Sequence, residues 1–385
     1  MSALKRAIAA PVPLLRRVAA RASSRAVSLA LNPVLLRDAR SMFRGRRASF
    51  LQLVYLLTLV IAMGIAALIC YEQNVSGGYR SSGISEYGRY IFVGIFETQV
   101  VVVLLIVVAY SAASIALERE KQTYDMLAVS TLSSAEIVFG KMASITLLCY
   151  MLLLTSAPLA AFSLLFGGIS PNAVASSYAI LALKIPLWAA IGVLASTVVG
   201  RSIPAYVTTL VALGAENFAS FTLMAVSGSP SAIALLNPAL GPFVDDPYLQ
   251  FALLGHPISP WLISIPYHLL LTGLAFVGAA ESMLHYHPKR SIWLRSLLLL
   301  FTLFFAFMLT VSFLEGPLSG ARGIPTEFLM FPLMLLWAWA CVFAPIFSSY
   351  PADPVRRSAP ISSRKLLLSP LHWWRRDPSS RASAA

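Results

Sequence analysis

Four ionisable side chains that could do chemistry stand inside long apolar stretches of this sequence: Glu97, Lys184, Glu216 and His268. Charged groups in such surroundings are costly, so they usually pair with one another, line a polar pathway or reach an interface. Glu216 lies near the middle of its apolar stretch and cannot reach an interface easily. It is our best candidate for a pathway or inter-helix residue, with a structural hydrogen bond as the equal alternative.

The other three residues have simpler interpretations. Glu97 and Lys184 each lie six or seven residues from the end of an apolar stretch, where a long side chain can extend to the polar interface. We expect Lys184 to do so, and for Glu97 we keep both interpretations open. We expect His268 to be a core histidine that bonds to a neighbouring helix.

Motifs for catalysis and nucleotide binding are absent from the sequence. It contains no G-x-x-x-x-G-K-[ST] phosphate loop and no H-E-x-x-H or G-x-S-x-G motif. Glu281, His285 and His287 could supply metal ligands, but a fourth ligand is missing, so we expect a solvated loop there. The three cysteines lie far apart in apolar runs and indicate neither disulfides nor zinc. We therefore expect a chain that is not an enzyme and binds no cofactor or metal itself.

The composition identifies the environment in which these residues must work. Of 385 residues, 58% are hydrophobic and 12% are charged, against roughly 25% charged in an ordinary soluble domain. A soluble fold of this size could not cover its surface with so few charges. Because lipid offers backbone groups no partners, membrane segments of this kind should be helices. We predict an all-α, polytopic membrane protein.

Eight stretches are long and apolar enough to cross about 30 Å of hydrocarbon as helices. The fourth and fifth are separated only by residues 201–203, so they should form a tight antiparallel hairpin. The outer segment 227–258 is apolar but interrupted by five prolines, and we expect short re-entrant helices there. The predicted spans are 49–71, 90–115, 142–167, 178–200, 204–226, 259–280, 292–314 and 327–349.

Basic residues are distributed unevenly about these spans. Segment 1–48 holds eleven Lys and Arg with the single acid Asp38, and the tail 350–385 holds seven. With eight spans, 25 of the 29 basic residues fall on one side of the membrane and three on the other. The positive-inside rule therefore predicts a multi-pass protein of the cell (inner) membrane with both termini cytoplasmic. This accounts for the net charge of +13 without a nucleic-acid partner.

The N-terminal segment divides into two parts. Residues 1–31 form a basic, Ser- and Ala-rich arm, and such a composition also fits an organelle transit peptide. We favour an arm held against anionic lipid headgroups.

Residues 32–48 are predicted to form an amphipathic helix that lies in the membrane plane. Asn32 is a good N-cap, and Pro33 suits the first helical position. Apolar residues including Phe43 fall on one arc and arginines on another, so the apolar face would enter the acyl boundary. The alternative is a surface helix of a soluble domain. The basic arc consists of Arg37, Arg40, Arg44 and Arg47.

The loop 117–141 is the most polar helical stretch of the chain. We expect the helix of the second span to continue from Glu118 to Leu127 and the chain to turn around 130–133. Ser133 and Glu136 have capping-box spacing, which predicts the start of a helix that runs into the third span. The loop should project into the cytoplasm as a helical hairpin tip, either to dock a protein or as a solvated connection.

The order of these features resembles the type 2 permease family of ATP-binding-cassette transporters. The likeness covers roughly 32–285 and rests on the amphipathic helix beginning Asn-Pro, on E-R-E-x-x-T-x-D-x-L and on S-x-x-E-I-V-x-G-K. Gln122 stands where the family often has Gly, and Thr131 where it often has Pro; both departures would retune docking rather than abolish it. The matching positions are Glu118, Arg119, Glu120, Thr123, Asp125, Leu127, Ser133, Glu136, Ile137, Gly140 and Lys141.

The resemblance implies that 117–141 is a coupling loop that docks on a separate ATPase subunit, where ATP and Mg would bind. It implies an exporter that contains a second permease copy. It also implies that segment 227–258 closes the outer end of the transport pathway. The six-span core would be 49–285, followed by two additional spans in 286–349. An ion-coupled secondary transporter that uses Glu97, Lys184 and Glu216 is the alternative. An intramembrane enzyme or a scaffold is a third interpretation, although clustered catalytic groups are missing from the sequence.

Overall fold

Helices dominate the described part of the chain. The computed structural model describes residues 32–43, 46–76, 84–124, 132–227 and 261–283, with shorter stretches at 242, 252–253, 256–257, 259, 294 and 296–304. Several predictions from the sequence lie outside these residues. They are the arm 1–31, Arg44, Asp125, Leu127, Thr131, most of the outer segment 227–258, His285, His287, most of the last two spans and the tail 350–385; the side chain of Arg47 is likewise not described.

The described helices follow one another in this order along the chain. They are α3 (Pro33–Phe43), α4 (Arg46–Ser76), α5 (Ile84–Glu120), α7 (Ser134–Ser163) with a 3₁₀ turn η1 (Leu164–Phe166), α8 (Pro171–Val199), α9 (Ser202–Ser227) and α10 (Trp261–Met283). A further helical stretch covers 296–304. Two short strands, β1 (Ala252–Leu253) and β2 (His256–Pro257), pair antiparallel before α10.

Four helices in the described residues are long and apolar enough to cross a membrane. The four segments are Ala48–Glu72, Tyr87–Glu120, Ser134–Phe166 and Pro171–Val199. The prediction of an all-helical, membrane-type protein is therefore confirmed at this level, and the first four predicted spans are found as helices. The fifth and sixth predicted spans are also helical, as α9 and α10, while the full count of eight stays a prediction.

Local signals set the ends of several helices. Ser133 is the N-cap of α7 and forms the predicted capping box with Glu136. Asn32 caps α3, since its side-chain oxygen accepts a hydrogen bond from the Val34 amide at 2.9 Å. Gly200 closes α8 with a φ of 72°, and α9 begins two residues later. The predicted tight hairpin between the fourth and fifth spans is thus confirmed.

Two predicted boundaries are wrong. The amphipathic helix does not run as one element to residue 48, because α3 ends at Phe43 and Arg46 already begins α4. The helix of the second span does not continue to Leu127, because α5 ends at Glu120. Residue pattern places a helix along the chain better than it places the ends of that helix.

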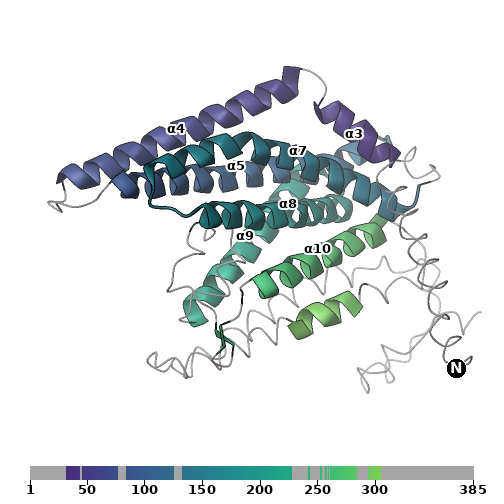
Figure 1. Cartoon of the computed structure of the whole chain (residues 1–385). Coiled ribbons are helices and arrows are strands. Elements are labelled where there is room, and N and C mark those ends of the chain that lie inside the picture. The colour runs from purple at the N-terminus through teal and green to yellow at the C-terminus, as the bar shows by residue number, and fades with distance from the viewer. Residues whose placement is uncertain are drawn as a thin grey trace, which may run out of the picture.

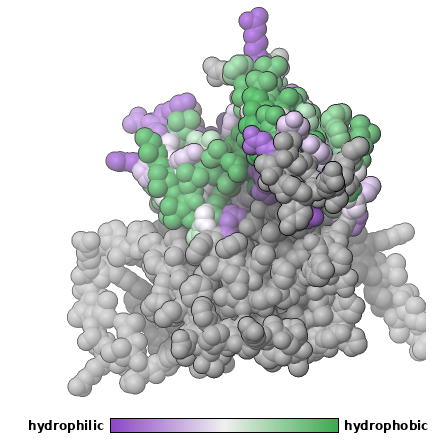
Figure 2. All heavy atoms as spheres, turned by 90° about the vertical axis from the view of Figure 1, so that its left-hand side faces the viewer, coloured by the Kyte–Doolittle hydropathy of each residue, from purple (hydrophilic) through white to green (hydrophobic). Residues whose placement is uncertain are grey.

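Helix α8 occupies the centre of the described bundle. It packs against α5, α7, α9 and α10, while α4 packs on α5 at the edge (Figure 1). Trp188 and Leu187 of α8 are fully buried. By contrast, α4 exposes large apolar side chains such as Phe50, Leu53 and Leu68. Figure 2, seen from the left-hand side of Figure 1, shows that hydrophobic side chains cover much of the described surface on that face. Lipid is the environment that suits such a surface.

Candidate functional site

Helix α3 is fastened across the end of the bundle where α5 ends and α7 begins (Figure 1). The Asn32 side chain has two partners: its oxygen caps α3, and its Nδ2 donates to the Glu136 backbone carbonyl at 2.6 Å. Gly140 of α7 allows the close approach, because a Cβ there would lie 2.9 Å from the Cβ of Val34. Asn32 and Gly140 therefore act together to seat α3 on α7.

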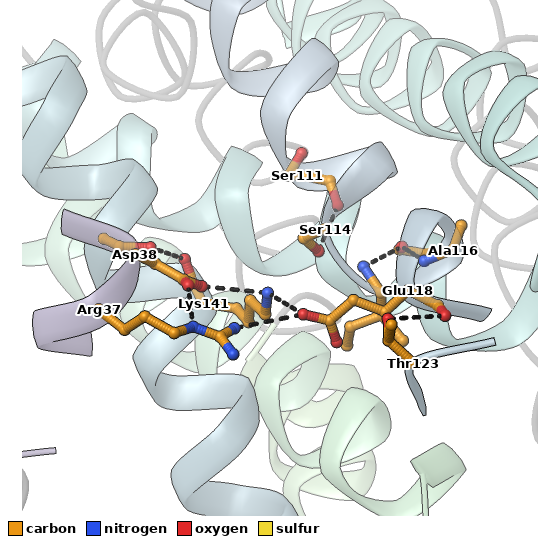
Figure 3. A network of polar contacts seen from close by, with 11 residues as sticks. Arg37, Asp38, Ser111, Ser114, Ala116, Glu118, Thr123 and Lys141 are labelled. Carbon is orange, nitrogen blue, oxygen red and sulfur yellow. Dashed lines mark hydrogen bonds and ion pairs between the residues drawn. The ribbon is translucent and has the colours of Figure 1, made fainter. Parts of the chain in front are cut away.

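A cluster of four charged residues joins α3, α5 and α7 (Figure 3). Lys141 Nζ lies 2.6 Å from Glu118 Oε1 and 3.0 Å from Asp38 Oδ2. Arg37 completes the cluster, with contacts of 2.9 Å to Asp38 and 3.4 Å to Glu118. Two cations and two anions thus balance one another where the ends of three helices meet.

The members of this cluster differ in exposure. The Lys141 side chain is 8% exposed, and Asp38 and Glu118 are 13% and 17% exposed, whereas Arg37 is 59% exposed. Partial burial opposes the charge on Arg37, but the hydrogen bond and charge of Asp38, with the nearby Glu118, raise the pKa of Arg37 above its ordinary value. The Asp38–Lys141–Glu118 contacts are shielded from solvent and therefore form the stabilising centre of the cluster. The more exposed contacts of Arg37 contribute little to stability.

The end of α5 is a Schellman motif. The Thr123 amide donates to the Glu118 carbonyl at 2.9 Å, and the Gln122 amide donates to the Arg119 carbonyl at 3.1 Å. Gln122 has a φ of 58° and is the one non-glycine with positive φ among the described residues. Glycine is favoured at this position of the motif because it has no Cβ to clash. Gln122 therefore ends the helix at some conformational cost.

The same tip of α5 also contacts α9 and α10. Glu120 caps the start of α9 from outside the helix, since its carboxylate accepts hydrogen bonds from the Ser202 amide at 2.8 Å and from the Ser202 hydroxyl at 2.9 Å. Tyr124 donates its hydroxyl proton to the Met283 carbonyl at the end of α10, at 3.3 Å. Arg119 lies over the Tyr124 ring, 4.9 Å from its centre. Five helices therefore meet at residues 118–124.

A second polar site lies inside the bundle. Lys184 of α8 forms an ion pair with Glu216 of α9, and both side chains are 0% exposed. Tyr267 of α10 donates its hydroxyl proton to the same Glu216 oxygen at 3.4 Å. His268 packs edge-on against Tyr267, with ring centres 5.3 Å apart, and shares a hydrogen bond with the Ser264 carbonyl through Nδ1.

These contacts correct two interpretations made from the sequence. Lys184 does not extend to the outer interface, because it is fully buried against Glu216. His268 bonds within its own helix, to Ser264 of α10, rather than to a neighbouring one. Glu97 is partly exposed on α5 and does not join the ion pair. The position of a charge along a span gives its depth, whereas its direction depends on how the helices pack.

Other predicted site residues are placed individually. Arg40 and Phe43 are exposed on α3, and Ser133 with Glu136 caps α7. Lys121, Gln122 and Thr123 form the exposed surface of the α5 tip. Glu281 lies in the last turn of α10.

Four residues that take part in these sites were missed by sequence reasoning: Asp38, Tyr124, Ser202 and Tyr267. Asp38 carried a usable signal, since it is the single acid in a strongly basic segment. Ser202 carried no such signal, because its partner Glu120 lies 82 residues away in the chain.

Comparisons with protein-family models, with curated proteins and with solved structures found no match to this chain.

Proposed function

We propose that this chain is the transmembrane permease subunit of an ATP-driven exporter of the ATP-binding-cassette type. ATP and Mg would bind on a separate ATPase subunit. The observation that carries the proposal is the ionic cluster at the end of α5, where Glu118 contacts both Lys141 of α7 and Arg37 of α3. A force applied to the α5 tip would reach the amphipathic helix and two apolar helices directly.

The tip has the properties that a docking element needs. Its exposed residues, Lys121 to Thr123, lie beyond the last turn of α5, while Glu118 and Glu120 on the protein side bond to other helices. In the proposed mechanism the ATPase holds the exposed side and moves the tip. Glu118 then transmits the movement to α3, and Glu120 and Tyr124 transmit it to α9 and α10.

The proposed arrangement in the membrane follows from charge. The described end that contains α3 and the α5 tip carries Arg37, Arg40, Arg46, Lys121 and Arg201, which supports a cytoplasmic position under the positive-inside rule. We propose eight spans, cytoplasmic termini, an inner-membrane location, contact of the arginines with anionic lipid, and a second permease copy in the complex.

Purification of the tagged, full-length chain from its native membranes tests this proposal. We expect an ATP-hydrolysing subunit to co-purify with the parent chain. The Lys121→Glu variant should co-purify with less than about a tenth of the parent's amount of that subunit, which corresponds to a loss of roughly 1.4 kcal/mol or more in binding free energy. The control is Arg46→Glu, an exposed cation on α4 at the same end, which should retain the subunit. Absence of any ATP-hydrolysing subunit from the parent complex would refute the proposal.

The buried Lys184–Glu216 pair favours one alternative, an ion-coupled secondary transporter, because charges inside a membrane often serve in ion pathways. Proteoliposomes that contain only this chain distinguish the two functions. Under the alternative, an imposed proton gradient should collapse without ATP, and the uncharged double variant Lys184→Met/Glu216→Gln, which leaves no buried charge unpaired, should stop the collapse. Under the exporter proposal, the gradient should persist as it does in empty vesicles.

A further inference from the structure

The Lys184–Glu216 ion pair lies at the middle depth of the bundle. Lys184 is 13 residues after the start of α8 and 15 before its end, which places it about 20 Å from either end at roughly 1.5 Å per residue. Glu216 is likewise 14 residues after the start of α9 and 11 before its end. Neither side chain can reach water along its own helix.

Each charge would be costly in this position without the other. Both side chains are fully buried, and an unpaired charge at the centre of a membrane helix is strongly unfavourable. A buried pair is tolerated because the two charges cancel, and removal of one partner leaves the other uncompensated. The packing of α9 against α8 therefore depends on opposite charges at positions 184 and 216.

The surrounding contacts extend this dependence to a third helix. Tyr267 of α10 donates to the Glu216 oxygen that also accepts from Lys184. On the same helix, the Ser282 hydroxyl donates to the Thr197 hydroxyl of α8 at 2.6 Å. A second polar contact therefore joins α10 directly to α8. One carboxylate oxygen thus connects the adjacent helices α8 and α9 with α10, which begins more than 40 residues after Glu216.

One small residue sets how closely α8 approaches two of its neighbours. Gly192, eight residues after Lys184, lies where α8 meets both α5 and α9, because a Cβ added there would lie 2.6 Å from the Ser111 Cβ and 3.3 Å from Thr209 Cγ2. Apolar contacts and close approach alone allow a helix to rotate about its axis or tilt against its neighbour, even where a short loop joins the two. A buried ion pair allows one register, in which its two charges meet.

We propose that Lys184 and Glu216 form a charge-neutral lock that fixes the register of α9, and through Tyr267 that of α10, on α8 in the middle of the membrane. The lock is a device for assembly and conformation. It assigns these two residues neither to a transport pathway nor to a proton relay, and it does not depend on the proposed exporter function.

Charge reversal on the full-length chain tests the lock. Lys184→Glu places two carboxylates together, and Glu216→Lys places two ammonium groups together. Because a buried charge without a partner is strongly destabilising, each single variant should yield at least about ten-fold less folded, monodisperse protein after mild detergent extraction. The exchange variant Lys184→Glu/Glu216→Lys restores opposite charges and should recover folded yield to within about two-fold of the parent.

Two further variants separate charge balance from other effects of mutation. The uncharged pair Lys184→Met/Glu216→Gln keeps an acceptor for Tyr267 and should also recover the yield. Glu97→Lys reverses a partly exposed carboxylate on α5 and should lower the yield by less than about two-fold. The lock is overturned if either single reversal at 184 or 216 folds as well as the parent, or if neither double variant exceeds the single ones.

Discussion

At the scale of single residues, two backbone positions beside the α5 tip have the same conformational requirement but different side chains. Gly200 and Gln122 both adopt positive φ, at 72° and 58°. An L-residue in this conformation brings its Cβ close to the following carbonyl oxygen, at a cost of roughly 1 kcal/mol or more. Gly200 avoids this cost and Gln122 does not.

Replacement of Gln122 by Gly should therefore stabilise the chain by about 1 kcal/mol. The reverse change, Gly200→Ala, should destabilise it, and its Cβ would also lie 3.1 Å from an Arg119 nitrogen. Thermal unfolding of the detergent-solubilised protein measures both. A shift of Tm in the same direction for the two variants would contradict the conformational explanation.

Gly192 gives a second prediction at this scale. Gly192→Ala should destabilise the bundle by about 1–3 kcal/mol, as expected for overpacking, because its Cβ would overlap Ser111. Gly273→Ala in α10 is the matched control: no atom lies within 4 Å of the added Cβ, and alanine is the better helix former. The order of Tm should be Gly273→Ala, parent, Gly192→Ala, and any other order counts against the observed packing.

At the scale of elements, α3 is the helix whose position depends on a few polar contacts. Its predicted apolar arc does not lie uniformly in lipid: Met42 packs against the bundle core, whereas Leu36 and Phe43 are each 37% exposed. Asn32 and the Asp38–Lys141–Glu118 chain attach one side of α3 to the bundle. These contacts hold α3 in one position on the bundle, so the helix is not free to slide.

Variants of Asn32 separate its two roles. Asn32→Ser keeps a capping oxygen but removes the bond to the Glu136 carbonyl, whereas Asn32→Ala removes both. Loss of a cap costs roughly 0.5–2 kcal/mol, so hydrogen exchange of the α3 amides should be fastest in Asn32→Ala and intermediate in Asn32→Ser. Equal exchange in the parent and in Asn32→Ser would show that the contact with α7 does not hold the helix.

At the scale of the whole molecule, the charged ends of the helices gather on one side. The α5 tip, the start of α9 and the end of α10 are joined there by hydrogen bonds. At the opposite end, Gly88 of α5 lies against the carbonyls of Gly167 and Ser163, and few charged side chains are described. This asymmetry distinguishes the two ends of the described bundle, and which end faces the cytoplasm stays a prediction of the positive-inside rule.

Single cysteines should report that side directly. In a background with Cys70, Cys149 and Cys341 replaced by Ala, Lys121→Cys should react with a membrane-impermeant maleimide only after the cells are opened. Asn172→Cys, at the exposed start of α8 on the other side, should react in intact cells. Labelling of Lys121→Cys from outside would reverse the proposed orientation and remove the basis of the ATPase-docking surface.

The sequence was a good guide wherever the physical cause was local. Apolar length predicted the spans, and the capping chemistry of Asn32 and Ser133 predicted where α3 and α7 begin, because a cap involves neighbours two or three residues away. The candidate site was predicted less completely. Glu118 and Lys141 were recognised from a family resemblance, but Asp38, the second carboxylate that pairs with Lys141, lies about 100 residues before it in the chain.

Composition and hydropathy thus determined by themselves that this protein is helical and suited to a membrane, since burial of apolar side chains and backbone hydrogen bonds leaves a lipid-embedded chain few other choices. The tertiary structure alone decided that Lys184 faces Glu216 and that Glu120 caps a helix in another part of the chain. Those outcomes depend on how each helix is rotated about its axis and on which helices pack together, and the sequence of one helix does not specify either.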